Sequence, residues 1–267
     1  MKIKYLLTCA LMLLCGAQTF AQDSEVVVYP SDGKPANGQE IEGTNVSFTL
    51  GDDGKWKAVA YITAGTANAQ FKQNYTDSEG ASKSAIAYIT GNNNPKDGPL
   101  SETDASTGGS YSASKANNPA SGTYYVITPT VAGKVSACIV LNSTKSLFVT
   151  KSDGTMLDPD AGELTVIDKD GNAVTLGENE DSNGNMIPYS VASKLNGGLV
   201  QFDAEAGESY YIFCTGSKLG FAGVEFTPSG DEPTPDPSGV RGDLDGDGKV
   251  TVTDILILVN IFLGIAS

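Results

Sequence analysis

The chain has 267 residues, which is enough for one large domain or two smaller ones. Its 17 basic and 32 acidic residues give a formal net charge of −15, which argues against nucleic-acid binding because that function needs lysine and arginine gathered on one face. Histidine is absent, which excludes Ser-His-Asp and Cys-His catalytic systems and histidine-ligated zinc.

The N-terminus predicts a secretory signal peptide over residues 1–21. Lys2 and Lys4 precede an apolar run at residues 5–14, and residues 19–21 place small side chains around a cleavage site. We therefore expect a secreted protein, extracellular or periplasmic, whose mature chain begins at Gln22. No other apolar run approaches the ~20 residues of a membrane-spanning helix, so we expect no membrane span.

Residues 22–229 predict an all-β domain, folded as an antiparallel β-sandwich. Short runs rich in β-branched and aromatic residues alternate with Gly, Asn, Asp and Ser, and no amphipathic helix period is visible. Residues 91–121 are poor in strand formers and indicate a long functional or disordered loop. The expected strands are residues 25–29, 45–50, 56–63, 85–90, 122–129, 133–141, 146–150, 164–168, 173–176, 198–202, 209–214 and 220–226.

The sequence Asp-Lys-Asp-Gly-Asn at residues 168–172 lies between two alternating runs and predicts a hairpin turn. A metal loop is the alternative interpretation of its acids. Asn179 stands where a closing acid would be needed, so we favour the plain turn.

Two cysteines, Cys138 and Cys214, remain after removal of the signal peptide, and each lies in an apolar strand-like run. An exported protein can join such a pair in a disulfide, but buried free cysteine is common. We favour two separate core thiols and keep the disulfide as the alternative.

Two adjacent tyrosine pairs, Tyr124-Tyr125 and Tyr210-Tyr211, fall within expected strands. Successive side chains of a strand point to opposite faces, so one tyrosine of each pair must face away from the core. The outer members are candidates to line a shallow groove, although half-buried sheet tyrosines are the commoner case.

Residues 230–240 carry three prolines among acids and predict a semi-stiff spacer before a module at residues 241–267. Residues 243–254 have the spacing of a calcium loop, in which oxygen ligands stand at positions 1, 3, 5, 7, 9 and 12 and glycine at position 6. Gly248 occupies the glycine position, and a solvated turn is the alternative. The predicted Ca²⁺ ligands are Asp243, Asp245, Asp247, the backbone carbonyl of Lys249, Thr251 and Asp254.

The segment after this loop, residues 255–263, predicts a short helix in which Asn260 is the one polar residue. Such a helix is unstable alone in water and too short to span a bilayer. It therefore has to dock on the chain's own sandwich, on a second copy or on a partner protein.

Residues 241–264 resemble a type I dockerin, the module that anchors secreted polysaccharide-degrading proteins to cohesin domains. A dockerin normally carries two loop–helix repeats, and this chain has one. The resemblance implies that Val252 and Thr253 contact a cohesin-like partner. The helix residues expected to pack against that partner, or against the chain's own sandwich, are Ile255, Leu256, Leu258, Val259 and Phe262.

Residues 122–226 are similar to jelly-roll modules of secreted bacterial polysaccharide-active proteins. The likeness lies in the Thr-Tyr-Tyr-Val-Ile-Thr-Pro start, the Val-Ala-Gly-Lys-Val turn and the Tyr-Tyr-Ile-Phe-Cys end of this segment. It implies a jelly-roll-like sandwich that binds rather than catalyses.

These expectations favour a secreted, non-catalytic carbohydrate-binding or adhesion protein of a polysaccharide-degrading system. A structural scaffold or surface-assembly subunit is the alternative, and a glycoside hydrolase is a further one, because two acids suffice for that chemistry. Sugar rings stack on exposed aromatic faces, although Trp56 alternates with apolar residues and is also a candidate core residue. The aromatic candidates for ligand binding are Trp56, Tyr75, Tyr88 and Tyr111.

We predict that Asp243→Ala and Asp254→Ala each abolish tight Ca²⁺ binding, because each removes a carboxylate ligand and Asp254 also begins the helix. Isothermal titration calorimetry with CaCl₂ measures the effect, with Asp236→Ala in the spacer as the matched control. Unchanged calcium affinity in both loop variants would refute the site.

Overall fold

The computed structural model describes residues 23–95, 118–180, 186–216 and 218–229. The expected signal peptide, spacer, calcium loop and C-terminal helix lie outside these residues. The described chain is all-β with antiparallel sheets, and its one helical element is the short 3-10 turn η1 (Ala69–Phe71). No helix among these residues is long and apolar enough to cross a membrane.

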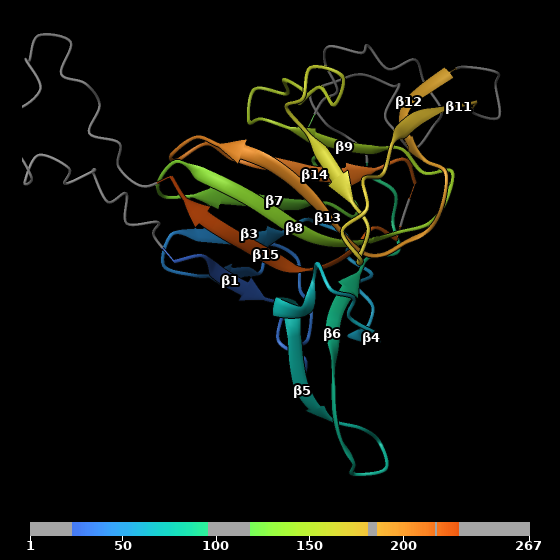
Figure 1. Ribbon diagram of the computed structural model, residues 1–267. Helices are drawn as coiled ribbons and strands as arrows, with labels where there is room; N and C mark the ends of the chain where they lie inside the picture. Colours follow the sequence, from blue (N-terminus) through green and yellow to red (C-terminus); the bar gives the residue numbers. More distant parts are fainter. Residues whose placement is uncertain (1–22, 96–117, 181–185, 217, 230–267) are drawn as a thin grey trace, which may run out of the picture. The chain divides into compact units, whose positions relative to one another are not determined.

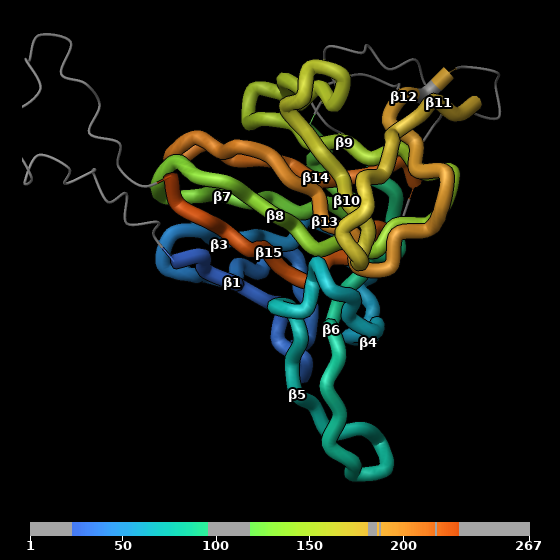
Figure 2. Tube along the Cα trace, viewed as in Figure 1, coloured from blue at the N-terminus to red at the C-terminus, as the bar shows by residue number. Residues whose placement is uncertain are grey.

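The larger sheet has the order β10-β13-β8-β15-β6-β4, with β1 beside β15 and β5 beside β6. Figure 2 shows β10 next to β13. The strands of this eight-stranded sheet are β1 (Glu25–Val28), β4 (Ala60–Ile62), β5 (Lys72–Thr76), β6 (Ser82–Thr90), β8 (Gly133–Leu141), β10 (Thr165–Ile167), β13 (Leu195–Ala204) and β15 (Gly220–Pro228).

The second sheet has five strands in the order β2-β3-β7-β14-β9 and lies against the larger one (Figure 1). A separate hairpin pairs β11 with β12. The bounds are β2 (Glu40–Glu42), β3 (Val46–Leu50), β7 (Tyr125–Pro129), β9 (Leu147–Thr150), β14 (Tyr210–Cys214), β11 (Leu176–Glu180) and β12 (Met186–Val191).

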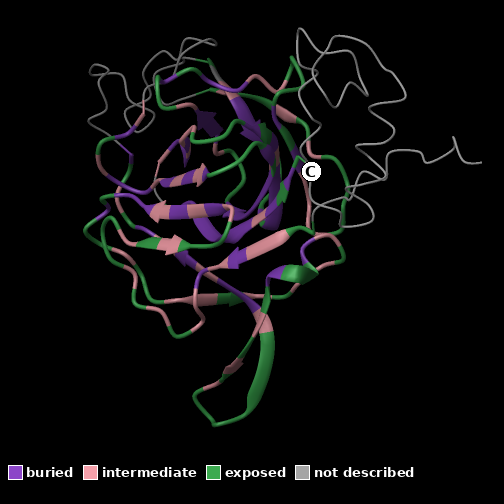
Figure 3. Ribbon diagram, turned by 90° about the vertical axis from the view of Figure 1, so that its left-hand side faces the viewer, coloured by how far each residue is buried: buried purple, intermediate pink, exposed green. Residues whose placement is uncertain are grey.

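A single hydrophobic core fills the space between the two large sheets. In β3, Val46, Phe48 and Leu50 are buried and alternate with half-buried Ser47 and Thr49, the period expected of a strand with one face in a core. Aromatic rings join the layers, since the Phe48 and Phe221 ring centroids are 4.9 Å apart. Figure 3 shows the buried residues concentrated in the packed strands.

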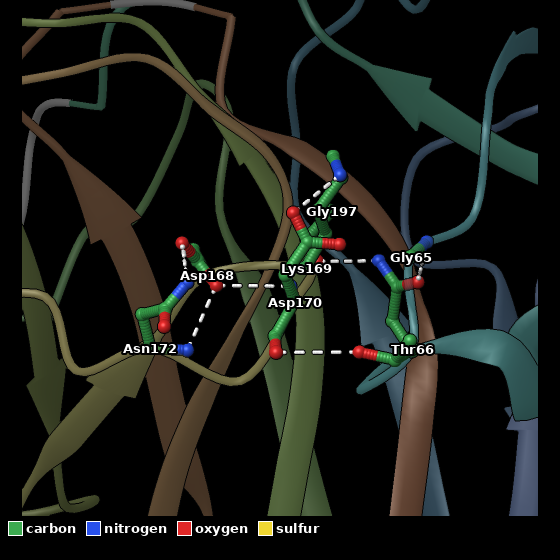
Figure 4. A network of polar contacts seen from close by, with 8 residues as sticks. Gly65, Thr66, Asp168, Lys169, Asp170, Asn172 and Gly197 are labelled. Carbon is green, nitrogen blue, oxygen red and sulfur yellow. Dashed lines mark hydrogen bonds and ion pairs between the residues drawn. The ribbon is translucent and has the colours of Figure 1, made fainter.

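The far face of the eight-stranded sheet is covered by the chain around η1. Asn68 is fully buried there, where its amide nitrogen donates to the Gly197 carbonyl at 2.6 Å and its side-chain oxygen accepts from Gly65 N at 2.8 Å. Thr66 Oγ1 donates to the Asp170 carbonyl at 3.2 Å (Figure 4). Side-chain and loop hydrogen bonds therefore connect residues far apart in the sequence.

The turn at residues 168–172 confirms the predicted hairpin turn. Asp168 N donates to the Asn172 carbonyl at 2.8 Å, and the Asp168 carboxylate accepts from the amides of Asp170 and Asn172 at 2.9 Å each. The hydrogen bond from the Asn172 side chain, followed by the Asn172 backbone amide, lowers the pKa of Asp168. The carboxylate therefore satisfies the turn's own donors.

A buried carboxylate, that of Asp53, ties three segments together. Asp53 is 3% exposed and accepts from Asn93 N at 2.9 Å, from Lys55 N at 3.0 Å and from Thr123 Oγ1 at 2.5 Å. Asn92 N donates to both of its oxygens at 3.0 Å. A carboxylate can be buried when its lone pairs are satisfied in this way.

The expected strand at residues 56–63 is wrong in its extent, since only Ala60–Ile62 forms β4. The preceding residues are held by side-chain bonds, because Trp56 Nε1 donates to Asn37 Oδ1 at 2.9 Å and Lys55 N donates to Asp53. The sequence prediction also missed β2, β5, β11 and β12. β5 carries Lys, Gln, Asn and Thr around one tyrosine, so it lacks an apolar period.

The prediction of two separate core thiols is confirmed, since Cys138 and Cys214 are both free and buried. Cys214 lies in the core between the sheets, whereas Cys138 packs with Phe71 and Ile86 on the far face of the eight-stranded sheet. Burial raises the pKa of Cys214 to about 12 and also raises the pKa of Cys138.

These raised pKa values predict that stability falls as the pH rises above about 8.5, where thiols ionise in the unfolded chain but stay protonated in the fold. Between about pH 8 and about pH 9.5 we expect a loss of about 1 kcal/mol for each thiol, measured by urea unfolding. The variants Cys138→Ala and Cys214→Ala should each lose half of this dependence. If the stability of both variants changes with pH as much as that of the parent chain, the two thiols are not the source of the pH dependence.

The Asp53 cluster predicts that Asp53→Ala lowers the free energy of unfolding by roughly 3 kcal/mol, because it leaves the buried Thr123 hydroxyl and three partly buried backbone amides without this acceptor. Urea unfolding at neutral pH measures the change. The control is Asp32→Ala, at an exposed position, for which we expect a change within about 0.5 kcal/mol. Equal stability of the two variants would show that the buried carboxylate is dispensable.

Candidate functional site

The predicted aromatic ligand-binding residues occupy different environments. Trp56 is half-buried and packs on the core, with its ring centroid 5.8 Å from that of Tyr125. Tyr88 is half-buried in the cluster on the far face of the eight-stranded sheet, and Tyr111 lies outside the described residues. Tyr75 remains, and its ring is part of a stacked pair.

Tyr61 and Tyr75 form this pair, which we call the hairpin tyrosine pair. Their ring centroids are 3.8 Å apart and their planes differ by 9°. Tyr61 is 37% exposed and is the one aromatic residue among the exposed large hydrophobic side chains of the described chain. Tyr75 comes from β5, and the β5–β6 hairpin extends away from the two packed sheets (Figure 1).

Strand register explains how the two rings meet. Tyr61 lies opposite Ala87 and Tyr75 lies opposite Lys83, on either side of β6. By strand alternation Lys83, Ala85 and Ala87 share the face that carries both rings. The small side chain of Ala85, midway between the two registers, leaves room for the rings to approach each other.

Hydrogen bonds hold the hairpin tyrosine pair in place. The Tyr61 hydroxyl donates to the Ser31 carbonyl at 2.9 Å. On β5, Gln73 accepts from Ser31 N at 3.1 Å and donates to the Tyr29 carbonyl at 2.6 Å. Both strands that carry the rings are therefore fixed to the same loop, so the stacked arrangement is preorganised.

Sequence reasoning identified Tyr75 but missed Tyr61. In the expected strand, Trp56 alternates with Ala58, Ala60 and Ile62 and so lies with them on one face. The same alternation places Tyr61 on the opposite face, and this was the available signal. What could not be seen was that β5 pairs with β6 and brings Tyr75 within stacking distance.

A second aromatic surface lies on the outer face of the five-stranded sheet. As predicted, one member of each adjacent pair faces away from the core: Tyr125 and Tyr210 are fully buried, whereas Tyr124 and Tyr211 are half-buried. The outer two rings have centroids 6.0 Å apart and planes 25° apart, so they are offset rather than in face-to-face contact. Burial, followed by the charges of ionised Tyr211 and of Asp52, raises the pKa of Tyr124.

The predicted metal and partner residues of the C-terminal module, residues 243–262, lie outside the described residues. Within the described ranges, no three Cys, Asp or Glu side chains gather closely enough to hold a metal ion.

Comparison with known proteins adds no family to this description. No protein-family model matches the chain, and a search of curated proteins finds no significant similarity.

Proposed function

We propose that this protein is a secreted, non-catalytic glycan-binding module with a jelly-roll-like sandwich. The hairpin tyrosine pair is the observation that carries the proposal. An aromatic ring exposed to solvent and fixed by hydrogen bonds offers an apolar face to the C–H side of a sugar ring without a further loss of conformational freedom.

The charge of the chain narrows the class of glycan. The formal net charge of −15 repels sulfated and carboxylated polysaccharides at long range. Around the pair, Lys83 is already within 3.6 Å of Asp77, so its charge is locally balanced. We therefore propose a neutral polysaccharide as the ligand.

In this proposal the C-terminal module, residues 241–267, is the part of the protein that docks on a partner or on the chain's own sandwich. The carboxylate spacing of residues 243–254 supports a Ca²⁺ site, and the apolar segment at residues 255–263 supports docking on a cohesin-like protein or on the chain's own sandwich. Calcium would order the loop by neutralising four neighbouring carboxylates, and so would couple ion binding to docking.

We predict that Tyr75→Ala and Tyr61→Ala each weaken polysaccharide binding about tenfold, because each removes one ring of the stack. The measurement is retention of the purified chain on insoluble neutral polysaccharides such as cellulose, xylan and mannan. Tyr61→Phe keeps the ring and loses only the hydroxyl contact, so it should retain most of the binding.

The matched control is Val131→Ala, which changes an exposed apolar side chain elsewhere on the described surface. If Tyr124→Ala and Tyr211→Ala lose binding and the Tyr61 and Tyr75 variants keep it, the binding site lies on the outer face of the five-stranded sheet instead. Absence of retention on every polysaccharide would refute the glycan-binding function.

A further inference from the structure

A hollow of about 440 Å³ lies at the open edge of β13, away from both aromatic surfaces. β10 pairs with β13 only at Leu199, Val200 and Gln201, so the next residues of β13 have no strand neighbour on that side among the described residues. Residues from the segment between β9 and β10 form the opposite wall. The volume falls within the roughly 300–1,000 Å³ of small-molecule sites.

Most of the residues that line the hollow are polar or charged. Leu157 and Phe202 also border it, but both belong to the core between the sheets and are almost fully buried. Exposed Lys134 and Asp203, which are cross-strand partners on β8 and β13, stand at the rim together with Glu163. Convergent polar groups in a concave site can fix the orientation of a small ligand.

The charges at the rim are balanced. Lys151 is held by Glu205 at 2.6 Å, and Glu163 accepts from Asp158 N at 2.9 Å. Lys134 makes no ion pair with another residue that the structure describes, so its ammonium can donate to a ligand. Because carboxylates accompany the ammonium groups, no single sign of charge dominates and an anionic ligand gains little.

A neutral sugar fits this set of groups. Each sugar hydroxyl can donate to a carboxylate and accept from an ammonium group. The hollow also differs from the tyrosine surface, because its two walls and its volume of about 440 Å³ suit one sugar ring rather than the middle of a chain.

We propose that this hollow binds a single neutral hexose ring, such as the terminal residue of a glycan chain. The inference rests on the proposed glycan-binding function and adds a second, separate site to it. Binding of one glycan chain or particle through both sites would raise the overall affinity above that of either site alone.

The test is a titration of the full chain with D-glucose, D-galactose or D-mannose, in which binding is monitored by NMR or by calorimetry. We expect binding of at least one hexose with a Kd in the millimolar range, about tenfold weaker in Lys134→Ala and in Asp203→Ala. Both positions are exposed, so these variants should fold, which urea unfolding checks. Lys194→Ala, at an exposed turn position, is the matched control.

Failure of every hexose to bind, or binding that is unchanged in both rim variants, overturns the proposal. Displacement of the sugar by inorganic phosphate would overturn the neutral ligand class. Polysaccharide retention that depends on Tyr75, without any hexose binding, would leave the proposed function standing and remove only this second site.

Discussion

The carboxylate of Asp53 joins the two ends of the connection between the sheets. The chain leaves β6 in the eight-stranded sheet at Thr90 and enters β7 of the five-stranded sheet at Tyr125, and both ends of this passage bond to Asp53. The close approach needs glycine: a β-carbon at Gly91 would collide with Asp53 and Thr123, and Gly122 adopts a φ of +94° beside the Asn94 carbonyl. One buried side chain thereby bonds to Thr123, directly before Tyr124 and the start of β7.

The sequence was sufficient for the all-β class and for most strands that line the core, because a core face imposes a period of two that β3 and β7 display plainly. Turn chemistry was also visible at residues 168–172. Strands whose pairing depends on a neighbour rather than on burial, such as β5, carry no such period. The stacking of Tyr75 on Tyr61 could not be predicted for the same reason, because it depends on how strands distant in the sequence pair with β6. The calcium loop stays a prediction from spacing.

Much of the eight-stranded sheet is covered on both faces, by the five-stranded sheet on one and by the chain around η1 on the other. β8 is consequently buried at eight of its nine positions, and Lys134 near its start is the exposed one. The exposed features of the described chain are peripheral: a protruding hairpin, an unpaired strand edge, and Tyr124 and Tyr211 on the outer side of the smaller sheet, which pack against a buried cluster around Phe148 and Phe213.

Trp56 gives the molecule an intrinsic optical reporter. It is the single tryptophan of the chain, its ring lies 5.8 Å from that of Tyr125, and its indole nitrogen donates to Asn37. Its fluorescence therefore arises from one known position where the loop before β4 meets the core. Emission wavelength and quenching report the integrity of that junction without any attached dye, and energy transfer from neighbouring tyrosines reports the packing around it.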